Sequence, residues 1–263
     1  MKAGRFVIAL VFVLSVSTSV QAEWHFGIGT GLFLQNLKGD EGFHSELVDR
    51  PVVIEEDLSP DDFSEFTESA FGFGGYASNG TWVIRYSAGM LKLEGGGSVK
   101  RVPAQVEGKL SAQLNYDVTF GELIAGYPVY SHGKFTLRGE AGLRYTRHDI
   151  NFATSRRISP NPPTNRNRNI DESWTDFVVG LSTTVAFAKD WTWDSLLNGG
   201  FGGSEGSYTA QTGIGWHFAK HWAASLYGKY AAIEYENGKP GDSDWYLYDA
   251  DEFGVGLSFL FTW

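Results

Sequence analysis

The last eleven residues, 253–263, constrain the fold more than any other part of the sequence. Large apolar side chains occupy every odd position of this segment, and mostly small residues occupy the even positions. The odd positions are Phe253, Val255, Leu257, Phe259, Phe261 and Trp263. A strict period of two gives a β-strand one apolar face and one mostly small face. Since a tilted strand needs about 9–11 residues to cross a bilayer, the segment predicts a membrane-crossing strand, with the last strand of a soluble sandwich as the alternative.

The same alternation recurs upstream. The segments that carry it are 24–34, 71–73, 82–90, 109–127, 135–145, 177–187, 191–201, 208–218 and 222–230. With the last segment they predict an all-β, transmembrane, up-and-down antiparallel β-barrel of ten strands. Eight strands is the alternative, if the first long region or the hairpin 191–218 is interpreted differently. In 109–127 the apolar phase changes near Gly121, which indicates either a β-bulge or an upper half that stands above the membrane.

The connections between these segments alternate in length. Four are short: 78–81, which contains Asn79-Gly80, and 128–134, 188–190 and 219–221. Most of the others are long and polar: 38–67, 94–106, 153–172 and 236–244, with 202–206 as a short exception. Short turns on one side and long loops on the other are typical of a membrane barrel whose short turns are periplasmic. Ser59 followed by Pro60 also predicts the start of a short helix, with Ser59 as its cap.

The C-terminal pattern resembles a known class. A final strand with alternating aromatic residues and an aromatic last residue is similar to the insertion signal of small Gram-negative outer-membrane β-barrel proteins. The matching residues are those at the odd positions from Phe253 to Trp263. The resemblance implies that the barrel-assembly machinery reads this strand. It covers the mature chain by pattern and identifies no subfamily.

The N-terminus predicts export. Lys2 and Arg5 precede an apolar run from Phe6 to Val16, and a small-residue tail ends in Val20-Gln21-Ala22. This is the pattern of a signal peptide cleaved after residue 22, because the apolar run is too short to span a bilayer as a helix. We therefore expect a signal peptide at 1–22, a single barrel domain at 23–263 and a location in the cell outer membrane.

Composition excludes several classes of protein. Without cysteine, the chain offers no disulfide and no thiolate site. Loss of the signal peptide takes the formal net charge from −10 to −12, and no basic face indicates nucleic acid as a partner. The pattern Gly27-x-Gly29-x-Gly31 lies within a strand and precedes no helix, so it predicts no nucleotide site. We expect no cofactor, no metal site and no catalytic residues.

Charged residues recur on the face opposite the apolar one, which points into the lumen if the apolar face meets lipid. They are Arg85, Glu122, Arg138, Glu140, Arg144, Asp176, Asp194, Lys229 and Glu252. Because isolated charges at this depth are costly, they should pair with each other or contact water. The simplest interpretation is a polar filling of a narrow barrel. A gated path for ions or small solutes and a catalytic set are the alternatives.

A histidine and a group of four arginines are further candidates for a catalytic or binding role. His148 is one of two histidines expected toward the outer end, and since neighbouring strand residues point to opposite faces it should not combine with Asp149. We expect it on the surface. Arg156, Arg157, Arg166 and Arg168 fall in the segment 153–172. Arginine suits bidentate contact with lipid phosphate, and pairing with the acidic segment 38–67 is the alternative.

The sequence therefore favours a non-enzymatic outer-membrane barrel, either structural or a narrow conduit for ions or small solutes. A barrel hydrolase acting on lipid A or peptide is one alternative. A surface barrel for adhesion or ligand binding is the other. The expected partners are outer-membrane lipid, lipopolysaccharide and the barrel-assembly machinery.

Overall fold

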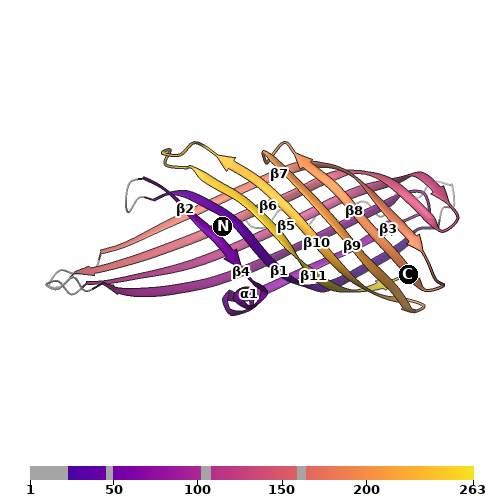
Figure 1. Cartoon of the computed structure of the whole chain (residues 1–263), viewed down its shortest axis with the longest axis horizontal. Helices are drawn as coiled ribbons and strands as arrows, with labels where there is room; N and C mark the ends of the chain where they lie inside the picture. The colour runs from indigo at the N-terminus through magenta and orange to yellow at the C-terminus, as the bar shows by residue number, and fades with distance from the viewer. Residues whose placement is uncertain (1–22, 46–49, 102–107, 159–163) are drawn as a thin grey trace.

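The computed structural model describes residues 23–45, 50–101, 108–158 and 164–263, and the expected signal peptide lies outside them. The described residues form eleven β-strands and one short helix (Figure 1). The first elements are β1 (His25–Ser45), β2 (Arg50–Leu58), α1 (Pro60–Phe66), β3 (Thr67–Ser78), β4 (Val83–Arg101) and β5 (Gly108–His132). The others are β6 (Phe135–Ile158), β7 (Thr164–Ala186), β8 (Trp191–Phe201), β9 (Gly206–Ala219), β10 (Trp222–Asn237) and β11 (Tyr246–Thr262).

The strands form one closed antiparallel barrel. Each strand from β3 to β11 pairs with the next, and β11 returns to β1 in a ladder from Gly27 opposite Thr262 to Phe43 opposite Tyr246. Ten positions in the wall are thus occupied, as predicted, and the eight-stranded alternative is wrong. In the described part of the chain, no helix has the length and apolar character needed to cross a membrane.

β2 and β3 share the tenth wall position. β1 pairs with β3 from His25 to Gly29 and with β2 from Leu37 to Ser45. In the β2 ladder Leu37 faces Leu58, whereas the β3 register extended upward would bring Phe66 to that place. The offset equals the eight residues that follow Leu58, most of which form α1. The strand is therefore one wall strand interrupted by a helical insertion.

The helix begins as predicted. Ser59 is its cap: its hydroxyl accepts from the Asp62 backbone, and the Asp62 carboxylate accepts from the Ser59 backbone, which completes a capping box. Pro60 stands at the first helical position, where its missing N–H is not needed. This seven-residue helix lies beside β1, β2 and β4.

The outer surface of the barrel carries an apolar belt, the set of exposed large apolar side chains on the outward faces. The lower end of the barrel is the one with the short turns, the start of β1 and the end of β11. There the belt begins with Trp82, Trp191, Trp222 and Trp263. At the upper end it finishes with Phe71, Tyr145, Phe177, Phe201 and Tyr208. Just above, the outward faces become charged, with Arg147 bonded to Asp171 and Lys92 to Asp117. The predicted outward faces agree with this belt.

The long polar segments predicted as loops mostly continue the strands, so the prediction of long loops is wrong for most of their length. β1 extends to Ser45, β6 to Ile158, and β2 lies within the segment 38–67. Above the belt a strand no longer needs an apolar outward face, so hydropathy alternation fades while the ladder continues. Of the two explanations for the phase change near Gly121, the β-bulge is wrong, and β5 instead continues above the belt, as the other explanation requires. β4 and β5 pair without a shift there, and the irregularity of β5 lies between Pro128 and Tyr130.

Above the belt the barrel divides into two four-stranded sheets. One contains the upper parts of β10, β11, β1 and β2, and the other the upper parts of β4 to β7. The division on one side arises because the β8–β9 hairpin turns back between Phe201 and Gly206, whereas β7 and β10 continue upward. On the other side α1 lies between the sheets, near β1, β2 and β4. We call this part the upper half.

Candidate functional site: the barrel interior

Ion pairs cross the lumen at the level of the belt. Arg85 on β4 makes a bidentate contact with Glu140 on β6, reaching past β5. The Glu140 side chain is buried, and a charge at such a place needs a close partner of opposite sign. Arg85 meets this need, whereas Arg138, which lies two residues from Glu140, instead donates to Thr184 Oγ1 at 3.2 Å.

Arg144 connects four strands of the wall. Its guanidinium lies 2.8 Å from the Glu122 carboxylate on β5 and donates to Asn198 Oδ1 on β8 at 2.9 Å. It also reaches Ser207 Oγ on β9 at 3.5 Å. Because the acceptors of its N–H groups lie on β5, β8 and β9 while its backbone is on β6, the side chain extends into the lumen. We call the ion pairs of Arg85 and Arg144 the charge layer.

Asp176 is fully buried on β7 and holds the tip of the β8–β9 hairpin. Its carboxylate accepts from the backbone N–H groups of Gly203 and Ser204, at 3.1 and 2.7 Å. It also accepts from the hydroxyls of Ser204 and Ser207, at 2.8 and 3.0 Å. With four donors the carboxylate needs no basic partner, so its role in this geometry is to anchor the short hairpin.

The remaining charges of the predicted lumen set lie apart from the charge layer. Asp194 accepts from the hydroxyls of Thr184 and Thr192, at 2.8 and 2.7 Å. The Lys229 ammonium lies over the Phe33 ring, 5.7 Å from its centroid. Glu252 accepts from the Tyr248 hydroxyl at 3.4 Å. The nine residues are therefore several local arrangements and not one network.

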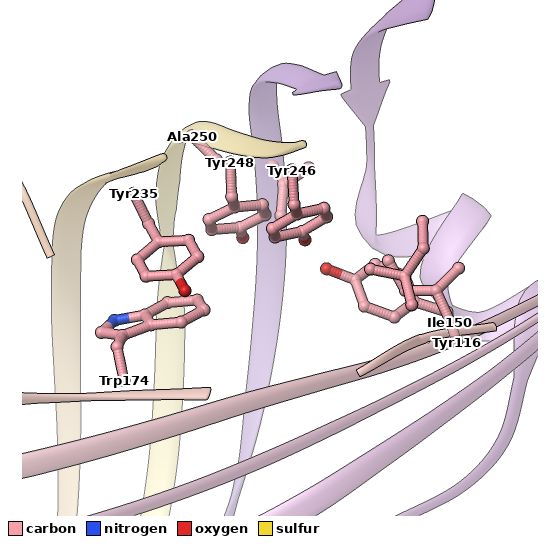
Figure 2. Close-up of a cluster of buried hydrophobic side chains, with 9 residues drawn as sticks. Tyr116, Ile150, Trp174, Tyr235, Tyr246, Tyr248 and Ala250 are labelled. Carbon is pink, nitrogen blue, oxygen red and sulfur yellow. The ribbon is translucent and has the colours of Figure 1, made fainter. Parts of the chain in front are cut away.

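The upper half has a core of its own, rich in aromatic residues from both sheets (Figure 2). We call it the aromatic core. Its buried members are Leu37, Tyr116, Ile150, Trp174, Tyr235, Tyr246, Tyr248 and Ala250, with Ile170. Trp174 on β7 stacks on Tyr235 on β10, with ring centroids 4.2 Å apart and planes inclined by 15°. These side chains fill the space between the sheets, directly above the lumen.

His148 on β6 lies inside the aromatic core. Its ring meets Trp174 and Tyr248 edge-on, with centroid distances of 4.9 and 4.6 Å. Its Nδ1 lies 2.8 Å from the Tyr246 hydroxyl and 2.9 Å from the Tyr116 hydroxyl. Since the Tyr246 hydroxyl donates its only proton to Glu41 at 2.8 Å, its oxygen accepts from Nδ1–H of His148. A hydrogen-bond chain thus runs from one sheet to the other.

The hydrogen-bond chain ends above the belt in two carboxyl groups, those of Glu41 and Glu56. Burial, and next the charge of Glu56, raise the pKa of Glu41 to about 8. Burial also raises the pKa of Glu56. Protonated Glu41 donates to Glu56, and this arrangement lets two acids share a buried place. Burial lowers the pKa of His148 to about 3, so the imidazole is neutral at physiological pH.

The surface position expected for His148 is wrong, since the residue is only 2% exposed. Its face was predictable: even positions of β6 point inward from Arg138 onward, and His148 continues that phase. What the sequence does not show is the second sheet, which covers the histidine with residues about a hundred positions away. Asp149 points outward, toward Arg147, as predicted.

The arginines of the segment 153–172 are described only in part. Arg168 donates to the backbone oxygens of His44 and Ser243, the latter at 3.0 Å, and lies 5.9 Å over the Phe43 ring. Two of its nitrogens therefore bind the protein itself. Arg156, Arg157 and Arg166 lie outside the residues whose side chains the structure describes.

No group of three or more His, Cys, Asp or Glu side chains is placed to hold a metal ion in the described part of the chain. An open pocket of about 330 Å³ lies between β1, β2 and β11 above the belt. Acidic residues dominate its lining, with Lys38 as the single base.

The ten-stranded wall, the apolar belt and the filled lumen define a class of fold. The chain resembles the outer membrane protease OmpT from Escherichia coli, with a TM-score of 0.61 at 10% identity over 94% of this chain and 99% of that one. This fold is that of an outer-membrane β-barrel. The translocator domain of the autotransporter NalP from Neisseria meningitidis matches with a TM-score of 0.41 at 12% identity, over 92% and 90% of the two chains. No family model and no curated protein matches the sequence.

Proposed function

We propose that this chain is a non-enzymatic barrel of the bacterial outer membrane that does not conduct solutes and carries the two-sheeted upper half on the outer side. The observation that supports it is that side chains occupy the interior at two levels. The charge layer lies across the lumen at the level of the belt, and the aromatic core closes the space above it. Of the two roles that the sequence favours, structural and conduit, this geometry favours the structural one.

Single-channel current in planar bilayers tests the closed interior. We expect the wild type to give small or no current, and the variant Glu140→Gln, which breaks the pair with Arg85, to give more. Glu65→Gln on α1 is the matched control, because that residue is exposed. A large, steady current through the wild-type protein would contradict the proposal and favour the conduit.

Membrane insertion through the belt is the second part of the proposal. Leu257 is exposed on the outward face of β11, whereas the next residue, Ser258, points inward and bonds to Ser225 at 2.6 Å. In bilayers, a probe on Leu257→Cys should be quenched by a lipid-soluble quencher more strongly than one on Ser258→Cys. Leu257→Arg should lower the free energy of unfolding by about 2–4 kcal/mol if it meets lipid at the midplane. Stronger quenching at Ser258 would reverse the assignment.

Export, assembly and lipid contact complete the proposal. The signal peptide delivers the chain, the barrel-assembly machinery reads β11, and lipopolysaccharide surrounds the upper rim of the belt. Replacing Phe261 and Trp263 by serine should prevent assembly, which is measured by heat-modifiable gel mobility in outer-membrane fractions. Replacing Ser225 and Ser258 by alanine is the control, since those residues face the lumen. Normal mobility of the Phe261 and Trp263 variant would contradict an assembly role.

We do not propose a hydrolase. A general base must lie within hydrogen-bond reach of the proton that it removes from a bound substrate, and histidine is the most frequent one. His148 is covered by aromatic rings, and its Nδ1 is engaged by tyrosine hydroxyls of both sheets. These contacts favour a role in joining the two sheets.

A further inference from the structure

The backbone ladder between β1 and β3 is interrupted. It ends where Gly29 faces Gly74, and the ladder between β1 and β2 begins only where Leu37 faces Leu58. Between these points, β1 residues 30–36 have no backbone partner on this side. If the register of the ladder continued, they would face β3 residues 67–73. All these residues are in the described part of the chain, and one side-chain bond, from Thr30 to the Gly72 oxygen at 2.7 Å, joins them. We call this opening the β1–β3 gap.

The cause of the gap is the helical insertion. The chain leaves the wall after Leu58, forms α1, and returns at Thr67 to pair with β4. The first half of β3 therefore follows β4 and does not reach β1 until Gly74. α1 lies near β1, β2 and β4. In Figure 1 it is the coil at the lower edge of the view, beside the labels of β1 and β4.

The lower part of the gap lies at the upper end of the apolar belt. Leu32 and Leu34 border it on β1, with 75% and 63% exposure, and Phe71 borders it on β3 with 64%. These three are the most exposed large apolar residues of the described chain. In a bilayer such side chains require lipid around them, so hydrocarbon lies directly against the gap.

The interior behind the gap is sparsely filled. Gly31 on β1 and Ala70 and Gly72 on β3 occupy inward positions on its two sides. Phe33, the next inward residue of β1, stacks on Tyr227 of β10, so its ring leans away from the gap. A Cβ atom added at Gly72 would find only the Ala88 oxygen, at 3.7 Å, and Ala70 is exposed although it points inward.

Apolar and charged layers limit this space above and below. Leu58, Phe63 and Leu93 pack under the aromatic core and form an apolar ceiling. Arg85 of the charge layer lies lower on β4, beside Tyr76. A chain entering from the side would therefore meet apolar groups first and charges only at the bottom.

We infer that the β1–β3 gap is a lateral entrance through which an acyl chain of a surrounding membrane lipid reaches the space between the charge layer and the aromatic core. This rests on the proposed insertion in a membrane and is compatible with a lumen that does not conduct, because the entrance opens to the side. The gap is bordered by hydrocarbon-seeking side chains and leads to small inward residues, so an unbranched apolar chain is the ligand that fits both.

Quenching by brominated acyl chains tests the inference, and the absence of native cysteine makes single-site labelling direct. Leu91, opposite Ala70 on β4, points inward at the height of the gap. Thr136, near the lower turn of β6, points inward away from it, and Leu257 points outward. In vesicles of brominated phosphatidylcholine, fluorophores on Leu91→Cys and Leu257→Cys should both lose at least half of their emission, while that on Thr136→Cys keeps it.

A deletion closes the entrance. Removing residues 59–66 joins Leu58 to Thr67 and brings β2 and β3 into one register against β1, so the ladder should become continuous. If the shortened chain shows heat-modifiable mobility, quenching at Leu91→Cys should fall to the level of Thr136→Cys. Persistent quenching in a folded deletion variant would overturn the inference.

The intact chain decides the matter even if the deletion variant does not assemble. Equal emission at Leu91→Cys and Thr136→Cys, with Leu257→Cys quenched, would refute the entrance while leaving membrane insertion supported. Absence of quenching at Leu257→Cys would instead refute the insertion on which the inference rests. Quenching at Leu91→Cys and Leu257→Cys alone supports both.

Discussion

The two halves of the barrel are held together in different ways. At the level of the belt, most neighbouring strands are joined by backbone ladders, and the charged side chains inside are additions to a wall that is already closed. In the upper half, the described residues of the two sheets form no ladder with each other on the side above the β8–β9 hairpin. Contacts there come from side chains: Trp174 on Tyr235, and Tyr235 and Asn237 donating to Glu172.

This difference predicts unequal stability along the same strands. A ladder distributes its hydrogen bonds over many residues, whereas the aromatic core concentrates the joining of two sheets in a few buried groups. Local opening takes place where few buried contacts must be lost. The upper half should therefore separate without the lower half, and changes in its core should leave the belt intact.

Trp174→Ala should have the largest effect. Removing a buried tryptophan costs about 3–5 kcal/mol, and Trp174 contacts both His148 and Tyr235. Hydrogen exchange should accelerate in the upper parts of β7 and β10, while heat-modifiable mobility stays normal. Trp193→Ala, on the exposed belt, is the control and should leave exchange in the upper half unchanged. Loss of the whole barrel in Trp174→Ala would show that the halves are one cooperative unit.

Glu140→Gln should rank next and act on the lower half. Removing one partner of a buried ion pair costs about 3–5 kcal/mol, and the lower end of this range applies because Arg85 is one-third exposed. Thermal unfolding in detergent, with Glu65→Gln as the exposed control, measures the difference. Exchange in the upper half should not change. An unaltered melting temperature would place Glu140 in contact with water.

The pH dependence should be confined to the upper half. The lowered pKa of His148 gives stability that is complete above 6.5 and lost as the pH falls toward 3. The raised pKa of Glu41 gives stability that is complete below 4.5 and lost as the pH rises through about 8. Each slope is about 1.4 kcal/mol per pH unit. Between 4.5 and 6.5 the two slopes oppose each other, so we expect a plateau there.

Hydrogen exchange of the upper half, corrected for intrinsic rates, follows this plateau. Glu41→Gln should reduce the alkaline decline to the part that the raised pKa of Glu56 contributes, and keep the acid one, because glutamine does not ionise. His148→Asn should remove the acid decline alone. A single optimum near neutral pH in the wild type, unchanged by both substitutions, would exclude these two groups as its cause.

Ser59→Ala should have the smallest effect, about 1 kcal/mol, which is typical for loss of an N-cap. Only α1 and the adjacent ends of β2 and β3 should exchange faster, since the cap bonds are local. Ser64→Ala is the control, because Ser64 bonds only to the Asp61 backbone oxygen within the helix. Equal effects of the two changes would show that the cap does not determine the start of the helix.

The sequence predicted the belt-level strands because lipid imposes alternation on them. The same alternation predicts inward charges, but it does not indicate that Glu140 pairs with Arg85 rather than a nearer arginine. For the upper strands the sequence predicts loops, because outside a bilayer nothing requires an apolar outward face. His148 was misplaced because its cover comes from Tyr246 and Tyr248, which only the closure of the barrel brings near.

The hydrogen bond between Tyr246 and Glu41 joins residues 205 positions apart, on β11 and β1, whose pairing closes the barrel. The aromatic core is therefore incomplete until β11 has paired with β1. A chain arrested before that event would hold Trp174 without Tyr235 and Tyr248 beside it, and its indole would emit as in water. Closure of the barrel and burial of Trp174 should then occur in one kinetic step. The wavelength of its emission maximum therefore reports when the barrel closes.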